Sequence, residues 1–335
     1  MSLASTDGGP DCAPHGLEVP VRAWGVCAPR RPDGSASPID NEELGRMTEL
    51  SLRDRRKLDR FTMLGLCAAR VALAELGATE RADCGIANGT MLAGWCFAEP
   101  QLALLHGPGL TAMSPYLATA WFPAAPQGEI SIRLGLQGWA KTVATDRCAG
   151  AHAIALAAQR IMSGRQRRAL AGGTDAPLST MVRRALAGAG WQVDTLAEAA
   201  AYLLLDATAA SPLAVIGYDT GPAGDHEPFL AHLRRRRKSL RPGAAIGPAV
   251  VAADQTDRDT VPAVCDVLGV KPDDVVDVVA TSGDSLGASS AVAAALACEA
   301  LTRCDGGRPE RIAVAVARGH QGAAALWFRH RLSTD

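Results

Sequence analysis

The alternation of apolar and polar positions along the chain predicts strands that are interleaved with helices. A helix is predicted over 58–78, where apolar residues recur at helical spacing and the pattern stops at Gly77. An alanine-rich helix is predicted over 150–163, after a short strand and a turn. Strands are predicted over 18–30, 84–90, 129–138, 141–145, 167–177, 198–208, 212–221, 248–256, 274–283 and 311–319. Strands alternating with helices indicate an α/β protein with buried, parallel or mixed sheets.

The sequence also contains a short internal repeat. The segment Val-Ala-Thr at 143–145 leads through a turn into one Ala-rich helix, and Val-Ala-Thr at 279–281 leads into another. Repeated units of this kind predict two pseudo-equivalent halves, each with a small-residue helix at its centre. We place the halves at 17–175 and 176–335, with the second shortened, after a disordered lead at 1–16.

The composition is that of a globular protein, with 48% hydrophobic residues, 21% charged residues and a formal net charge of −1. Near-neutral charge predicts neither nucleic acid nor an anionic membrane as a partner. No apolar run approaches the ~18 residues of a membrane span, and the first residues lack the pattern of a signal peptide. The nine cysteines have no metal-type spacing and fit buried, reduced thiols. We therefore expect a cytoplasmic protein without metal or cofactor.

Several motifs, in order and spacing, resemble the ketosynthases of fatty acid and polyketide assembly. Over 118–154 the sequence is most similar to the chain length factor, the non-condensing partner of type II polyketide ketosynthases. The resemblance runs from about residue 17 to 329, and it implies a thiolase-like fold with two pseudo-repeated halves in αβαβα layers. The segments that carry it are RRALAGGTDAP, EAAAYLLLD, GDSLGASSAV, AAALWFR and ATAWFPAAPQGEISIRLGLQGWAKTVATDRCAGAHAI.

The resemblance also indicates where the catalytic residues of a ketosynthase would lie. These enzymes use a cysteine nucleophile and two histidines. The nucleophile position is occupied here by Arg147, with Cys148 one residue later, and the histidine positions by Asp254 and Asp284. One residue along a helix is a rotation of about 100°, which would direct the Cys148 thiol elsewhere. We expect no catalytic residue at these positions, and we expect Arg147 to pair with Asp254 or Asp284.

The function implied by the resemblance is that of a non-catalytic chain length factor. It would form an obligate heterodimer with an active ketosynthase, which receives malonyl units from an acyl carrier protein. This chain would then shape the tunnel for the growing polyketide during decarboxylative Claisen condensation. Two alternatives stay open: a divergent ketosynthase or acyltransferase that uses Cys148, and a stand-alone acyl-binding scaffold.

Three sets of residues are candidates for contacts with the substrate or a partner. By resemblance, the predicted helix at 94–107 carries the tunnel-gating residues Trp95, Ala98 and Leu102. The predicted partner interface is the aromatic cluster of Tyr116, Trp121 and Phe122. Ordinary core packing is the alternative for both sets. The predicted docking patch for an acidic carrier protein is Arg234, Arg235, Arg236, Arg237 and Lys238, unless it is a solvated helix face.

Overall fold

The structure is a computed structural model that describes residues 18–29, 38–222, 226–241, 244–253, 259–303 and 310–331. Within these residues ten strands are joined in the order β3-β2-β4-β5-β1-β6-β10-β9-β7-β8. The first five along the chain are β1 (Val19–Cys27), β2 (Cys84–Thr90), β3 (Ala140–Ala144), β4 (Arg168–Asp175) and β5 (Ala199–Asp206). The second five are β6 (Leu213–Pro222), β7 (Ala245–Ala252), β8 (Val275–Asp277), β9 (Glu310–Arg318) and β10 (Gly322–Arg331).

The same strand arrangement occurs twice. In the first set, β2 runs parallel to β3 and β4, and β5 runs antiparallel to β4 and β1. In the second, β7 runs parallel to β8 and β9, and β10 runs antiparallel to β9 and β6. The two pseudo-repeated halves are therefore present. Because β5 completes the first set, the halves change over between Asp206 and Leu213, later than the sequence-based division at 175/176.

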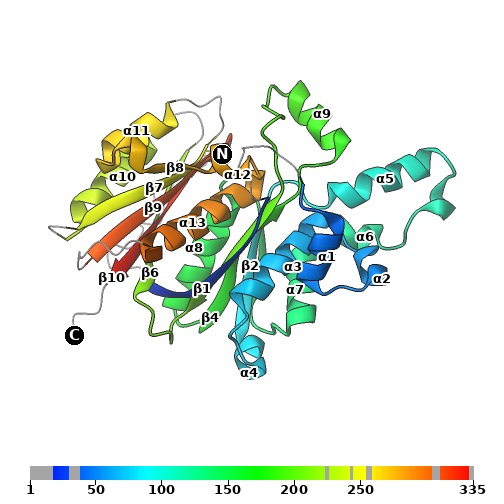
Figure 1. Cartoon of the computed structure of the whole chain (residues 1–335), viewed down its shortest axis with the longest axis horizontal. Helices are drawn as coiled ribbons and strands as arrows, with labels where there is room; N and C mark the ends of the chain where they lie inside the picture. The colour runs from blue at the N-terminus through cyan, green and yellow to red at the C-terminus, as the bar shows by residue number, and fades with distance from the viewer. Residues whose placement is uncertain are drawn as a thin grey trace, which may run out of the picture.

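The helices complete five layers (Figure 1). Two central helices, α8 (Ala149–Met162) and α13 (Ser289–Arg303), lie between the two halves of the sheet. On the outer face of the first half lie α1 (Asn41–Thr48), α3 (Arg60–Ala72) and α7 (Ala125–Leu134); α10 (Glu227–Ser239) and α11 (Thr260–Leu268) cover the second. The remaining helices are α2 (Leu52–Arg55), α4 (Ala78–Ala82), α5 (Trp95–His106), α6 (Leu117–Ala120), α9 (Thr180–Gly188), α12 (Val278–Ser282) and the 3-10 turns η1 (Leu110–Ala112), η2 (Pro272–Asp274) and η3 (Leu286–Ala288).

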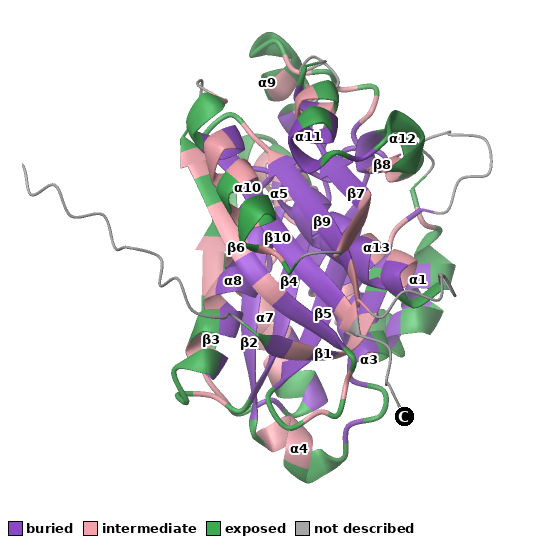
Figure 2. Cartoon of the chain, turned by 90° about the vertical axis from the view of Figure 1, so that its left-hand side faces the viewer, coloured by how far each residue is buried: buried purple, intermediate pink, exposed green. Residues whose placement is uncertain are grey.

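Side-chain alternation along the strands explains why both sheet faces are covered. On β5, Leu203 and Leu205 pack into the central core with α8 and α13, whereas Tyr202 and Leu204 pack on the outer side with α3. Figure 2 shows the middle strands buried and the edge strand β3 partly exposed. The small residues predicted for the central helices let them approach closely, since a Cβ on Gly150 would lie 2.8 Å from Cβ of Ala291.

Two sequence-based predictions of strands were wrong. Residues 129–138 contain the end of helix α7, because Pro126 lies in its first turn and Gly135 ends it in a left-handed conformation at φ 75°. Ile130 and Leu134, four residues apart, form its buried face. Residues 274–283 contain only the short strand β8 and then α12, whose first turn is capped by Asp277 through its bond from the Ala280 N–H at 3.0 Å. No helix of the described residues is long and apolar enough to cross a membrane.

Candidate functional site: a buried arginine at the nucleophile position

The centre of the candidate site is an ion pair between the two halves of the fold. Arg147 lies in the turn between β3 and α8, and Asp284 lies between α12 and η3. The Arg147 Nε–H is 3.1 Å from Oδ1 and 3.0 Å from Oδ2 of Asp284, and Nη2 also bonds to Oδ2. The two residues are only 1% and 2% exposed. The predicted pairing with Asp284 is thus present, whereas Asp254 lies outside the described residues.

An aromatic side chain covers this ion pair. The guanidinium carbon of Arg147 lies 4.8 Å from the ring centre of Trp191, within the range of a cation–π contact. His320, in the turn between β9 and β10, stacks on the same ring with centroids 4.2 Å apart. Trp191 comes from the connection between α9 and β5 and had no sequence signal beyond being one of six tryptophans.

Asp284 is also tied to the backbone that follows it. Its Oδ1 accepts a hydrogen bond from the Leu286 N–H at 3.0 Å and lies 3.3 Å from the Ser289 hydroxyl. A guanidinium has no lone pair for nucleophilic attack, and a carboxylate locked in an ion pair does not replace a histidine. This arrangement therefore cannot form an acyl thioester at the Arg147 position.

Cys148 contacts different elements from those of Arg147. It directly precedes helix α8, is 1% exposed, and its Sγ lies 3.6 Å from the Ala317 carbonyl and 3.5 Å from that of Gly322. Burial, with the nearby Asp146 carboxylate, raises the pKa of the Cys148 thiol well above its ordinary value. These surroundings favour the unreactive thiol over the thiolate.

Asp146 is a structural residue that the sequence did not reveal. Its Oδ1 accepts the N–H of Cys148 at 3.0 Å, and its Oδ2 accepts the N–H of Gln321 at 2.7 Å. It therefore joins the start of α8 to the β9–β10 turn, where Gly319 leaves room for the carboxylate. His152, in the first turn of α8, is half-buried, and burial lowers the pKa of its imidazole.

The predicted tunnel residues lie on α5, which extends away from the sheet beside α6 (Figure 1). Ala98 is the one residue of α5 that is buried in this chain, and Trp95 and Leu102 are half-buried. The aromatic cluster is exposed: Tyr116 by 41%, Trp121 by 43% and Phe122 by 54%. These three aromatic side chains are therefore not packed into the core of this chain.

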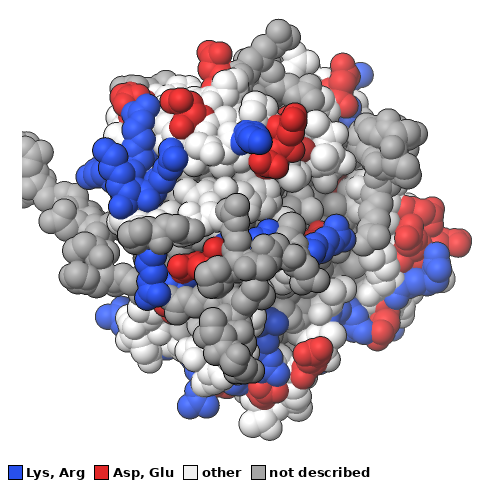
Figure 3. Space-filling model, turned by 60° about the vertical axis from the view of Figure 1, so that its left-hand side comes forward, with Lys and Arg blue, Asp and Glu red and all other residues white. Residues whose placement is uncertain are grey.

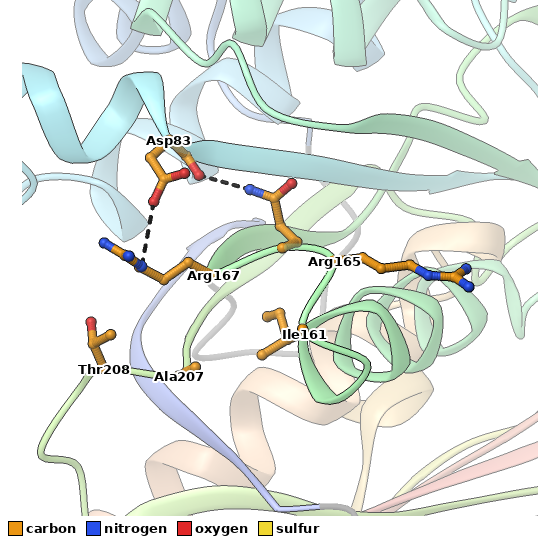
Figure 4. A pocket seen from close by; sticks show the side chains of 8 residues that line it. Asp83, Ile161, Arg165, Arg167, Ala207 and Thr208 are labelled. Atoms are coloured by element: carbon orange, nitrogen blue, oxygen red, sulfur yellow. Dashed lines mark hydrogen bonds and ion pairs between the residues drawn. The ribbon is translucent and has the colours of Figure 1, made fainter.

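Two surface hollows are also present. One of about 270 Å³ is lined by residues of α6, of α7 and of the connection between them, including Phe122 in that connection and the 80% exposed Ile132 of α7. The other, of about 470 Å³, lies at the far end of α8 from Arg147. Figure 4 shows Arg167 directed to Asp83 there, 3.9 Å away, and Arg165 directed away from both. This second hollow shares no residue with the candidate site.

The basic run forms the end of α10, and its members have different environments. Arg236 donates to Asp219 at 2.6 and 3.0 Å, and Arg237 donates to the Val267 carbonyl at 2.8 Å. Arg234 pairs with Glu227. Arg235 and Lys238 are exposed and have no ion-pair partner among the described residues. Figure 3 brings forward the side of the molecule where α10 lies. Lys and Arg side chains gather at the upper left of this view. Within the described part of the chain, no group of His, Cys, Asp and Glu could hold a metal ion.

Comparisons with known proteins find sequences and structures that are similar to this chain. Residues 40–201 match the sequence profile of the β-ketoacyl synthase N-terminal domain. The chain is 34% identical over 170 residues to the tetracenomycin polyketide synthase ketoacyl synthase beta subunit of Streptomyces glaucescens, which is 50% of this chain and 40% of that protein. The match spans about two fifths of the length of such relatives.

Solved structures extend the likeness to nearly the whole chain. The complex AntDE:AntF, of a type II polyketide synthase carrier protein with its ketosynthase bound to hexaketide, has a chain that matches with TM-score 0.75 at 23% identity. The alignment covers 94% of this chain and 99% of that one. The ishigamide ketosynthase/chain length factor matches with TM-score 0.72 at 18% identity, over 94% and 100%. Residues 40–201 are thus similar in sequence to the β-ketoacyl synthase N-terminal domain, within a chain that has the fold of these solved ketosynthase and chain length factor structures.

Proposed function

We propose that this chain is a chain length factor, a non-catalytic subunit that pairs with an active ketosynthase. The observation that carries the proposal is the buried Arg147–Asp284 pair, which stands at two positions that the resemblance assigns to catalytic residues. The partner would perform the decarboxylative condensation, and this chain would help to enclose the growing polyketide. The alternative of an enzyme that uses Cys148 is disfavoured by the burial and the raised pKa of that thiol.

A partner face on this chain supports pairing with a ketosynthase. We define it as Tyr116, Trp121, Phe122, Ile132 and the outer edge of β3. These apolar side chains are all more than 40% exposed, and in the described residues no strand pairs with the outer edge of β3. Exposed aromatic clusters and open strand edges are typical of surfaces that bind another protein.

The environment of α5 supports a role at the tunnel. This helix is apolar around most of its circumference, yet most of its residues are only half-buried by this chain. A helix of that composition is normally buried, so its remaining surface fits contact with a partner or an acyl chain. In this proposal Trp95 blocks the tunnel, Ala98 leaves space, and Leu102 lines the next turn.

The basic end of α10 supports docking of an acidic acyl carrier protein. Arg235, Lys238 and the following Arg241 are exposed, and none has an ion pair among the described residues. Arg236 and Arg237 serve a different purpose, since they fasten α10 to β6 and α11. We therefore restrict the proposed docking contacts to Arg235, Lys238 and Arg241.

The test is co-expression of this chain with a ketosynthase and a carrier protein, with product mass as the readout. We expect the product to require this chain, and Trp95→Gly to lengthen it by two-carbon units. Ala103→Gly is the control, because it places glycine at an exposed position of the same helix. Products of unchanged mass without this chain would contradict the proposal. Thiol-dependent condensation by this chain alone would favour the Cys148 enzyme.

A further inference from the structure

Helix α5 is held at its start by a carboxylate from another helix. Asp59, which precedes α3, is 1% exposed. Its Oδ1 accepts the N–H of Phe61 at 2.8 Å, which caps α3. Its Oδ2 accepts the N–H of Phe97 at 2.6 Å, in the first turn of α5. One buried carboxylate thus satisfies free N–H groups at the starts of two helices.

The residues just before α5 are held in the same way. Asp175, at the end of β4, accepts the N–H groups of Met91 at 2.7 Å and Leu92 at 3.1 Å. It also accepts the N–H of Gly287 at 2.9 Å, in the turn that follows Asp284. Asp175 therefore joins the segment that precedes α5 to the turn that follows Asp284. Asp59 joins the helix itself to α3.

We propose that Asp59 is a positioning residue for the tunnel helix, setting the place of α5 relative to the core without contacting the tunnel. The inference rests on the proposed function for its effect on product length, but not for its effect on the order of α5. Ala98 is the one buried residue of α5, and the later bonds of this helix run to other peripheral segments: Glu99 accepts the Met181 N–H at 3.1 Å and Gln101 accepts the Ser114 N–H at 2.7 Å. The bond from Phe97 to Asp59 is the one that joins α5 to the start of α3 in the core.

The two carboxylate oxygens of Asp59 bind different helices, and this difference makes the proposal testable. An asparagine has one acceptor oxygen and one amide nitrogen that only donates. In Asp59→Asn the oxygen can cap α3 through the nearby Phe61 N–H, and the amide then faces the Phe97 N–H, donor against donor. Asp59→Ser caps α3 with a single, shorter side-chain oxygen, so it also leaves Phe97 without an acceptor. The two variants thus test the same bond by different means.

Asp40→Asn is a matched control. Asp40 precedes α1, and its Oδ1 alone accepts the N–H groups of Glu42 at 2.8 Å and Glu43 at 3.1 Å. An asparagine there keeps the one oxygen that is used. The substitution is chemically the same as Asp59→Asn, but no second helix depends on it.

The experiment is amide hydrogen exchange on the full chain at pH 8, where Asp59, whose pKa burial raises to about 7, is mostly ionised. We expect exchange in peptides from the first turns of α5 to become at least about tenfold faster in Asp59→Asn and Asp59→Ser. Peptides from α3 and β5 should keep their rates, and Asp40→Asn should leave α5 unchanged. Unchanged exchange in α5 for both Asp59 variants would overturn the inference.

Product length provides a separate readout in the pair formed with a ketosynthase. A broadened product distribution in Asp59→Asn, with faster exchange in α5, supports both the positioning role and the tunnel. Faster exchange with unchanged products supports the positioning role and counts against the tunnel function of α5. The two ideas therefore fail in different measurements.

Discussion

Removing the positive charge of Arg147 should destabilise the fold far more than removing a surface arginine. The proposed change is Arg147→Met, which keeps much of the apolar stem and deletes the guanidinium. It leaves the 2% exposed Asp284 carboxylate without its ion-pair partner and removes the cation–π contact with Trp191. Removal of one member of a buried ion pair typically costs about 3–5 kcal/mol.

The double variant Arg147→Met/Asp284→Asn tests the cause of this loss. With asparagine at 284 neither position of the pair carries a charge, and the amide oxygen can still accept from the Leu286 N–H, which Asp284 Oδ1 binds at 3.0 Å. We therefore expect the double variant to be more stable than Arg147→Met alone, by about 1–3 kcal/mol. Additive losses would mean that the two residues do not act as a pair.

The measurement is urea unfolding followed by circular dichroism and by tryptophan fluorescence, because Trp191 lies directly on Arg147. The control is Arg133→Met. Arg133 forms a half-exposed ion pair with Glu129 at 2.7 Å, where a loss below about 1 kcal/mol is expected. If Arg147→Met costs no more than Arg133→Met, the Arg147–Asp284 pair does not hold the two halves of the fold together.

Three further predictions concern other parts of the molecule. Iodoacetamide should not label Cys148 of the native chain within minutes at neutral pH, since burial raises the thiol pKa; peptide mass spectrometry would detect rapid labelling, which would contradict this. The folded pKa of Asp59 is about 7 against an ordinary 3.8, so its protonated form stabilises the fold below pH 4 and that contribution is lost as the pH rises through 7. Wild type should therefore lose roughly 4 kcal/mol relative to Asp59→Asn over this range in parallel urea titrations, and a pH-independent difference would refute the assignment. Reversing charge at Arg235 and Lys238 should weaken carrier-protein binding about tenfold at low salt and less at high salt, while Arg165→Glu should not; equal binding by all three proteins would remove α10 as the docking site.

Much of the architecture was predictable because it follows from local patterns. The strands at 84–90 and 199–206 and the two Ala-rich central helices have a composition that suits full burial, and they lie where the sequence predicted them. The exceptions are instructive. Along 129–138, apolar residues at every second position fitted a strand, but burial of Ile130 and Leu134 on one side selected a helix.

Only part of the candidate site could likewise be predicted from the sequence. Sequence resemblance placed Arg147 and Asp284 at catalytic positions, because the order of motifs is carried by the chain itself. It could not decide whether Arg147 would pair with Asp284 or Asp254, since residues that are distant in the chain are brought together only by packing. The coverage by Trp191, the clamp by Asp146 and the two-helix anchor at Asp59 had no sequence signal for the same reason.

The sequence by itself therefore indicated the alternation of strands and helices, the internal repeat, and an arginine at the position that the resemblance assigns to the ketosynthase nucleophile. The tertiary structure decided what replaced that chemistry. It joined residues 137 positions apart in one buried ion pair, covered it with Trp191, and left α5 half-buried and anchored at its first turn. The physical reason is that backbone propensities and hydrophobic patterns act over a few residues, whereas charge pairing and helix anchoring depend on distances that only the folded chain establishes.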